Sequence, residues 1–162
     1  MPNTDWAALS QAGKQKFGAY GEYYAKMEFA SYGLDVYTSE VDDHGVDFIV
    51  RAAGGFYAIQ VKSIQTGTGY VFMRKTYFNA ENPRLCLCLL LFEQGRLPDL
   101  YLIPATAWQT ETPLFRSHEY GKPGQSSEAE YGLNLSRKNM PLLETFRFEK
   151  MVRQMREIGE PF

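Results

Sequence analysis

The sequence predicts an α/β fold in which helices flank a mixed central β-sheet. The first observation is the order of predicted elements, which runs helix, three strands, irregular segment, two strands and closing helix. The second is an unbroken apolar run at 85–92, typical of a strand covered on both faces. The third is size, because 162 residues with 44% hydrophobic content suffice for one core. With no internal repeat or linker in the sequence, residues 1–162 are predicted to form a single domain.

A helix is predicted over residues 9–32, where Phe17, Tyr20 and Tyr24 recur at helical spacing and Gly33 is a stop signal. Three strands are predicted next. They cover residues 34–41, 46–52 and 56–64, with a tight turn at 42–45 and a hairpin turn at Gly54-Gly55.

The segment 65–84 has no clean period, and we interpret it as loop, short strand and helical turn. Two further strands are predicted at 85–93 and 99–105. Gly, Ser, Pro and charged residues in 117–130 indicate a long exposed loop, followed by a short strand at 131–136. Apolar residues at mainly helical intervals beyond Pro141 predict a closing helix.

Composition excludes several classes of protein. The net charge of −2 argues against a chain coated with basic residues, although acidic residues dominate 1–50 and basic residues outnumber acidic ones in 51–100. No apolar stretch is long enough to cross a bilayer, and the N-terminus lacks the layout of a secretory signal. Cys86 and Cys88 are two apart in a strand, where they could not bridge each other, so we expect core packing and a cytoplasmic location.

Three polar residues interrupt two strands that otherwise resemble core. Gln60 and Lys62 share one face of their strand because strand side chains alternate. Asp47, on the strand before it, lies across the short hairpin and can present its carboxylate to the same patch. Taken singly, an aspartate at a strand start is more often a turn residue, and a Gln–Lys pair is more often a solvent-facing stripe. The apolar flanks favour a functional site, since a lysine buried without a partner is costly.

The predicted first helix adds Glu22, which shares a face with Ala25 and Phe29 and could lean toward the sheet. Carboxylates and a lysine on one sheet suit metal-assisted cleavage of phosphodiester bonds. Alone, a helical glutamate is more often a surface charge. Three neighbours of Asp47 are turn formers first and auxiliary ligands second; they are Asp42, Asp43 and His44.

The stretches "GEYYA", "GVDFIV" and "AIQVKS" resemble, in this order, the PD-(D/E)XK nuclease superfamily in the variant where Gln replaces the second acid. The sequence is also similar to restriction-endonuclease-like bacterial domains of unknown function. The resemblance implies a restriction-endonuclease-like core and a site that holds Mg²⁺ or Mn²⁺. Its implied roles are Asp47 as central metal ligand, Glu22 as helix-borne ligand, the Val61 carbonyl as further ligand, Lys62 as water-positioning residue and Gln60 as the polar group in place of an acid.

Basic and aromatic residues alternate between 70 and 84. Arg74, Lys75 and Arg84 are candidates for phosphate contact, and the aromatic residues among them could stack on bases or pack in the core.

These patterns favour a metal-dependent deoxyribonuclease that acts in restriction, repair or defence. The alternative is a catalytically inactive nuclease-fold module that binds nucleic acid or a protein partner. A third option is a structural α/β protein. DNA is the expected partner and no membrane association is expected; the sequence leaves open whether the chain forms a homodimer.

Overall fold

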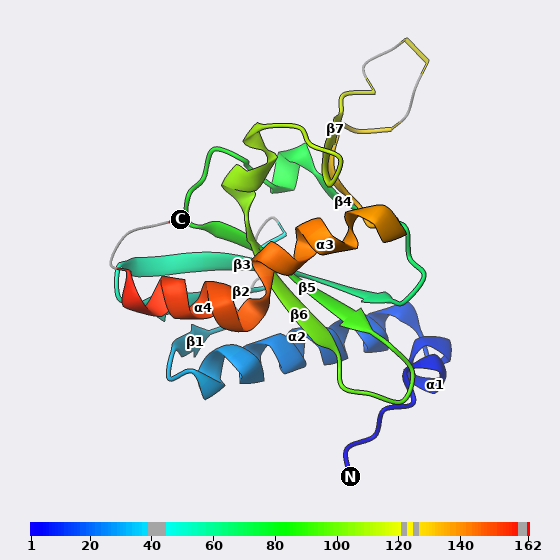
Figure 1. Cartoon of the computed structure of the whole chain (residues 1–162), viewed down its shortest axis with the longest axis vertical. Coiled ribbons are helices and arrows are strands. Elements are labelled where there is room, and N and C mark those ends of the chain that lie inside the picture. The colour runs from blue at the N-terminus through cyan, green and yellow to red at the C-terminus, as the bar shows by residue number, and fades with distance from the viewer. Residues whose placement is uncertain (39–44, 121–122, 125–126, 159–161) are drawn as a thin grey trace.

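The computed structural model describes residues 1–38, 45–120, 123–124, 127–158 and 162 (Figure 1). In chain order, its elements are α1 (Trp6–Gln11), α2 (Lys14–Ser31), β1 (Asp35–Tyr37), β2 (Phe48–Ala52), β3 (Gly55–Gln65), β4 (Tyr70–Arg74), the 3₁₀ turn η1 (Lys75–Tyr77), β5 (Leu85–Phe92), β6 (Asp99–Pro104), η2 (Ala105–Gln109), β7 (Phe115–His118), β8 (Glu130–Asn134), η3 (Arg137–Asn139), α3 (Met140–Leu143), η4 (Glu144–Phe146) and α4 (Phe148–Glu157).

The main sheet has five strands in the order β1-β2-β3-β5-β6. Strand β3 runs parallel to β5, and the other neighbours are antiparallel. Parallel strands need a crossover, which the segment carrying β4 and η1 supplies here. The sheet is therefore mixed and helix-flanked, which confirms the predicted fold class.

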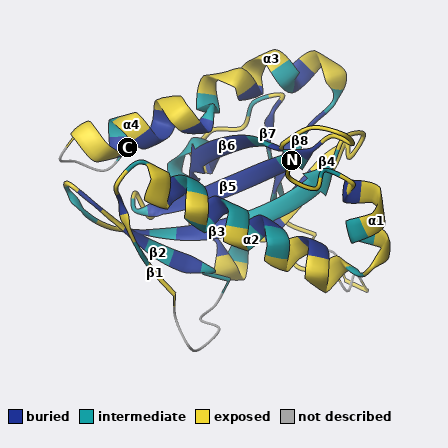
Figure 2. Cartoon of the chain, turned by 90° about the horizontal axis from the view of Figure 1, so that it is seen from below, coloured by how far each residue is buried: buried dark blue, intermediate teal, exposed yellow. Residues whose placement is uncertain are grey.

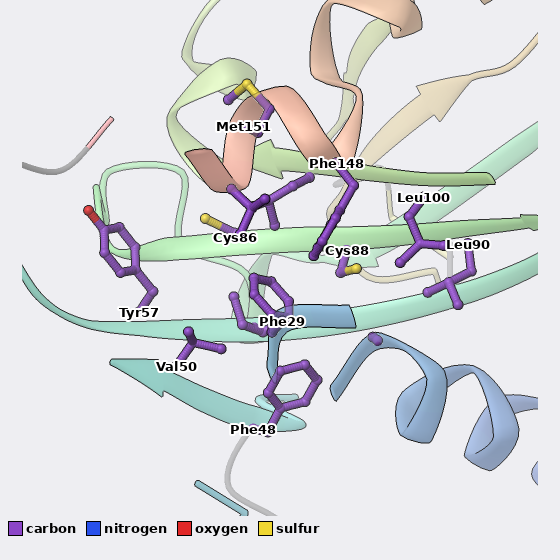
Figure 3. Close-up of a cluster of buried hydrophobic side chains, with 14 of the residues drawn as sticks. Phe29, Phe48, Val50, Tyr57, Cys86, Cys88, Leu90, Leu100, Phe148 and Met151 are labelled. Atoms are coloured by element: carbon purple, nitrogen blue, oxygen red, sulfur yellow. The ribbon is translucent and has the colours of Figure 1, made fainter. Parts of the chain in front are cut away.

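Helices α2 and α4 cover one face of this sheet. Phe29 of α2 and Phe148 of α4 meet edge to face, with ring centroids 4.8 Å apart. Figure 3 shows both rings directed at the middle of the sheet, near Cys88 and Leu90 of β5. Cys86 and Cys88 are fully buried free thiols, as the sequence predicts, and burial raises the pKa of both.

A second sheet of three strands, in the order β4-β8-β7, covers the opposite face. Its buried side chains, among them Met73 and Leu133, pack with Leu87 and Leu89 of β5. Strand β5 is thus buried from both sides, which Figure 2 shows at the centre of the molecule. The predictions did not include this sheet or the strand Phe115–His118 within it, and the loop predicted for 117–130 overlaps the ends of β7 and β8.

Two helix predictions need correction. The helix predicted for 9–32 is divided, because Gly13 has a φ of 132° and separates α1 from α2. The Asp5 carboxylate caps α1 by accepting the Ala8 N–H, so that helix begins earlier than predicted. The C-terminal helix is likewise broken into α3, η4 and α4. None of the described helices has the length and apolar character to span a membrane.

Candidate active site

The candidate site lies where β2 separates from β3. The antiparallel register between these strands ends at the pair Phe48–Ile59. Just before it, the Asp47 N–H donates to the Ile59 carbonyl at 2.9 Å. Two residues after Ile59 on β3, the Val61 N–H donates a hydrogen bond of 2.7 Å to Oδ2 of the Asp47 side chain. The carboxylate therefore takes the place that a backbone carbonyl of a longer β2 would fill.

This geometry also orients the Val61 carbonyl. Within a strand, the N–H and C=O of one residue point to the same edge, as the paired bonds of antiparallel ladders require. Because the Val61 N–H meets Asp47, its carbonyl faces the same edge of β3. The Asp47 carboxylate and the Val61 carbonyl, both ligands that the resemblance implies, therefore lie at the same edge of β3.

Gln60 and Lys62 project from the face of β3 opposite α2. In the parallel register they lie beside Leu87 and Leu89, whose side chains belong to the core under the second sheet. Gln60 is 9% exposed, and its Oε1 accepts no hydrogen bond from the residues that the structure describes. Its Nε2 would lie 3.5 Å from a Cβ built on Gly45, so the amide reaches the chain just before Asp47.

Lys62 lies between charges of opposite sign. Burial lowers the pKa of the Lys62 ammonium, the Asp47 carboxylate partly opposes this change, and the positive charge of Arg74 adds to it. The end of β4 reaches the site through the η1 turn, because a Cβ built on Gly45 would lie 3.1 Å from Tyr77 Cβ.

Glu22 approaches the sheet from α2 on the other face. The preceding Gly21 packs directly on β3, since a Cβ added there would come within 1.8 Å of Ser63 Oγ. Glu22 Oε1 forms an ion pair of 3.1 Å with Lys26 Nζ, and that ammonium lies 5.7 Å from the centre of the Phe48 ring. Glu22 and Lys26 thus share the side of α2 that faces the start of β2.

Lys26 is a charged neighbour of Glu22 that was not predicted from the sequence. The signal was present in their i,i+4 spacing, which places two residues next to each other on a helix surface.

The donor set fits a hard divalent cation. Carboxylate, amide and backbone carbonyl oxygens are the ligands that Mg²⁺ and Mn²⁺ prefer, and water completes their coordination. The unpartnered Gln60 Oε1 is a buried acceptor of this kind. No cluster of three His, Cys, Asp or Glu residues occurs in the described part of the chain, so a site here relies on neutral oxygens beside its carboxylates. Asp42, Asp43 and His44 lie outside the described residues.

Of the three residues predicted to contact phosphate, Arg74 and Lys75 are consecutive at the end of β4 and Arg84 lies apart from them. Arg74 is exposed on β4 and forms a 3.6 Å ion pair with Glu128. Lys75 contacts Ser117 and Glu119 and lies over the Tyr131 ring. Arg84 donates to the Gly54 carbonyl at 2.8 Å and lies over the ring of Tyr57, at the turn end of the β2–β3 hairpin.

Comparisons with known proteins give a fold and no sequence family. No protein-family model matches the chain, and no curated sequence does so significantly. Among solved structures, the bacterial homing endonuclease I-Ssp6803I is similar with a TM-score of 0.54 and 17% identity, covering 88% of this chain and 94% of that one. The Holliday junction resolvase Hjc of Archaeoglobus fulgidus has a TM-score of 0.49 and 11% identity, covering 84% of this chain and 95% of that one. The likeness to the homing endonuclease confirms the predicted restriction-endonuclease-like fold.

Proposed function

We propose that this chain is a metal-dependent nuclease that hydrolyses DNA phosphodiester bonds in restriction, repair or defence. One observation carries the proposal: the Asp47 carboxylate lies where β2 separates from β3, held by the Val61 N–H of β3, the strand that also carries the buried Gln60 and the half-buried Lys62. The fold shared with a homing endonuclease supports it.

Asp47, Glu22 and the Val61 carbonyl would hold the cation, with Gln60 Oε1 as a neutral neighbour. When bound, Mg²⁺ or Mn²⁺ polarises a phosphate and lowers the pKa of water. The amide at Gln60 attracts a cation less than a carboxylate does, which makes Glu22 the more important second ligand. Lys26 must release Glu22 for this role, because its ammonium already pairs with that carboxylate.

Lys62 is the residue proposed to position the attacking water. Its lowered pKa makes the amine a better proton acceptor near neutral pH than an exposed lysine. The neighbouring negative charge of Asp47 favours the protonated form, which donates hydrogen bonds to phosphate oxygen. Neutral Lys62 can therefore accept a proton from water, and protonated Lys62 can donate a hydrogen bond to the substrate phosphate.

The alternative function is a binding module without turnover. Two features favour a binding module. Gln60 is neutral, and the Lys26 ammonium already pairs with the Glu22 carboxylate, so less negative charge is left to attract a metal ion. Arg74 serves either function as a phosphate contact, because its guanidinium is exposed at the end of β4.

A cleavage assay with Mg²⁺ or Mn²⁺ on duplex, single-stranded and branched DNA tests the proposal. We expect the wild type to cut at least one substrate and Asp47→Asn to lose about 100-fold or more, equivalent to roughly 2.7 kcal/mol of transition-state stabilisation. Asp35→Asn is the matched control, because Asp35 is an exposed carboxylate on β1. DNA binding without cleavage by the wild type would favour the binding module, and equal cleavage by both variants would exclude the proposed site.

A further inference from the structure

The outer face of the second sheet carries side chains that the core does not use. Along β4, Val71 and Met73 are buried, while Tyr70, Phe72 and Arg74 alternate with them and face outward. Phe72 is 45% exposed. In Figure 1, β4 and β7 lie on the side of the molecule away from α2.

Aromatic rings from two strands meet on this face. Tyr70 lies across Gly132, where an added Cβ would come within 2.4 Å of ring carbons, and its hydroxyl donates to Glu130 at 2.6 Å. The Tyr70 and His118 rings are 6.1 Å apart, and Tyr120 stacks on His118 at 5.4 Å with an interplanar angle of 24°. We call Tyr70, Phe72, His118 and Tyr120 the aromatic face.

One end of the aromatic face approaches the candidate active site. Arg74 ends β4, and the η1 turn that follows brings Tyr77 to the site, since a Cβ built on Gly45 would lie 3.1 Å from Tyr77 Cβ and 3.5 Å from Gln60 Nε2. From Arg74, Phe72 and then Tyr70 follow on the same face in steps of about 7 Å, two residues of a strand each. Such steps are comparable to the spacing of successive nucleotides in an extended single strand.

Two arginines supply cations on this face. Arg74 pairs with Glu130 in the strand register, and Arg116 pairs with Gly132 in the same manner from β7. Their carboxylate partners are Glu128 and Glu111, each at 3.6 Å. Exposed ion pairs of this kind contribute little, so a phosphate can replace either carboxylate at small cost.

We propose that the aromatic face binds single-stranded DNA adjacent to the scissile phosphate, so that the substrate is DNA with an unpaired segment. The inference rests on the proposed function and names its substrate class. A duplex conceals the faces of its bases, whereas unpaired bases stack on exposed aromatic rings regardless of sequence. Arg74 and Arg116 contact the phosphates, and Arg74 lies at the end of the face that approaches the candidate active site.

Binding is measured by fluorescence anisotropy in EDTA, which separates binding from cleavage, on a single-stranded oligonucleotide and on a blunt duplex. We expect Phe72→Ala to weaken single-strand binding about tenfold or more, as loss of one stacking ring does, and to leave duplex binding unchanged. Phe56→Ala is the control, since Phe56 is a strand phenylalanine of 56% exposure at the turn end of the β2–β3 hairpin. It should bind both oligonucleotides like the wild type.

A second variant, Tyr120→Ala, removes a ring at the end of β7 where no core packing is lost. We expect it to weaken single-strand binding as well, and thermal melting checks that both variants are folded. The inference is overturned if Phe72→Ala and Tyr120→Ala bind single strands like the wild type, or if Phe56→Ala weakens binding equally. It is also overturned if the wild type cuts duplex DNA and binds no single strand; that result leaves the proposed nuclease intact. Absence of both binding and cleavage would remove the proposed function itself.

Discussion

The Asp47 carboxylate accepts a 2.7 Å hydrogen bond from the Val61 N–H, so one side chain both completes the edge of β3 and faces the proposed metal position. A carboxylate used in this way is fixed in place before any ligand arrives. Its stabilising and its catalytic contributions can be separated by substitution.

Replacing Asp47 by alanine leaves the Val61 N–H without this acceptor, whereas asparagine keeps an oxygen at the same position. We therefore expect Asp47→Ala to fold but to lose about 1 kcal/mol more unfolding free energy than Asp47→Asn. Both should lose nuclease activity. Urea titration monitored by circular dichroism measures the difference, and equal stability of the two variants would argue that the Val61 hydrogen bond contributes nothing.

Gln60→Glu adds a third carboxylate to the site. It should raise the affinity for Mn²⁺ because of the added Coulomb attraction, and lower stability in EDTA because the carboxylates repel one another. Melting temperatures in EDTA and in excess Mn²⁺ should differ more for this variant than for the wild type. Gln15→Glu, which adds the same charge at an exposed position of α2, is the control; an equal metal-induced shift in all three proteins would place the metal away from Gln60.

Lys62→Met should stabilise the protein at neutral pH while removing activity. Because the folded-state pKa of Lys62 lies below its ordinary value of 10.5, the unfolded chain binds more protons between those two values. The unfolding free energy of the wild type therefore rises with pH across that interval, because of Lys62. The advantage of the methionine variant, about 0.5–2 kcal/mol at pH 7, should shrink as pH approaches 10.5.

Denaturant titrations at several pH values between 7 and 10.5 measure this advantage. Lys16→Met, at an exposed position of α2, is the control and should show no such pH-dependent gain. A constant or growing difference for Lys62→Met would contradict the assigned burial.

Lys26→Met removes the ammonium that competes with a cation for Glu22. We expect Mn²⁺ affinity to increase by up to about fivefold, in line with the roughly 0.2–1 kcal/mol of a partly exposed ion pair. Isothermal titration calorimetry measures it. Unchanged affinity, or a decrease, would show that Glu22 is not a ligand or that Lys26 supports the site in another way.

Gly21→Ala should destabilise the fold by about 1–3 kcal/mol, because the new methyl group would overlap Ser63 Oγ and force α2 away from β3. Gly18→Ala is the matched control on the same helix, since nothing lies within 4 Å of its added Cβ. That change should stabilise the protein by about 0.5–1 kcal/mol through helix propensity. Chemical denaturation measures the unfolding free energy of both variants. A higher unfolding free energy for Gly21→Ala than for the wild type would show that α2 and β3 accommodate the methyl group without cost.

Local patterns predicted the hairpin that carries the candidate site. The Gly54-Gly55 turn and the alternation around it determine β2 and β3, and therefore place Asp47 directly before the last strand pair, Phe48–Ile59. The register and the shared face of Gln60 and Lys62 follow from the two-residue period alone.

Long-range pairing explains what the sequence did not reveal. Strand β7 contains Arg116 and His118 with a single buried ring at Phe115, so its pattern resembles a loop, and β8 stabilises it as a strand. The placement of Tyr77 against Gly45 likewise depends on how β4 and η1 return over the sheet, which no local period encodes. The division of the N-terminal helix depends on the φ of Gly13, a conformation that glycine permits without requiring it.

The parallel pairing of β3 with β5 has a consequence for synthesis on the ribosome. The β2–β3 hairpin is local and can close early, which brings Asp47 to Val61. Lys62, however, is flanked by Leu89, and that neighbour emerges only after the whole crossover has been translated. A nascent or truncated chain that stops before β5 thus carries Asp47 and Lys62 without the strand that flanks the lysine. The nuclease activity proposed above would therefore depend on completion of the sheet, and incomplete products of translation would lack it.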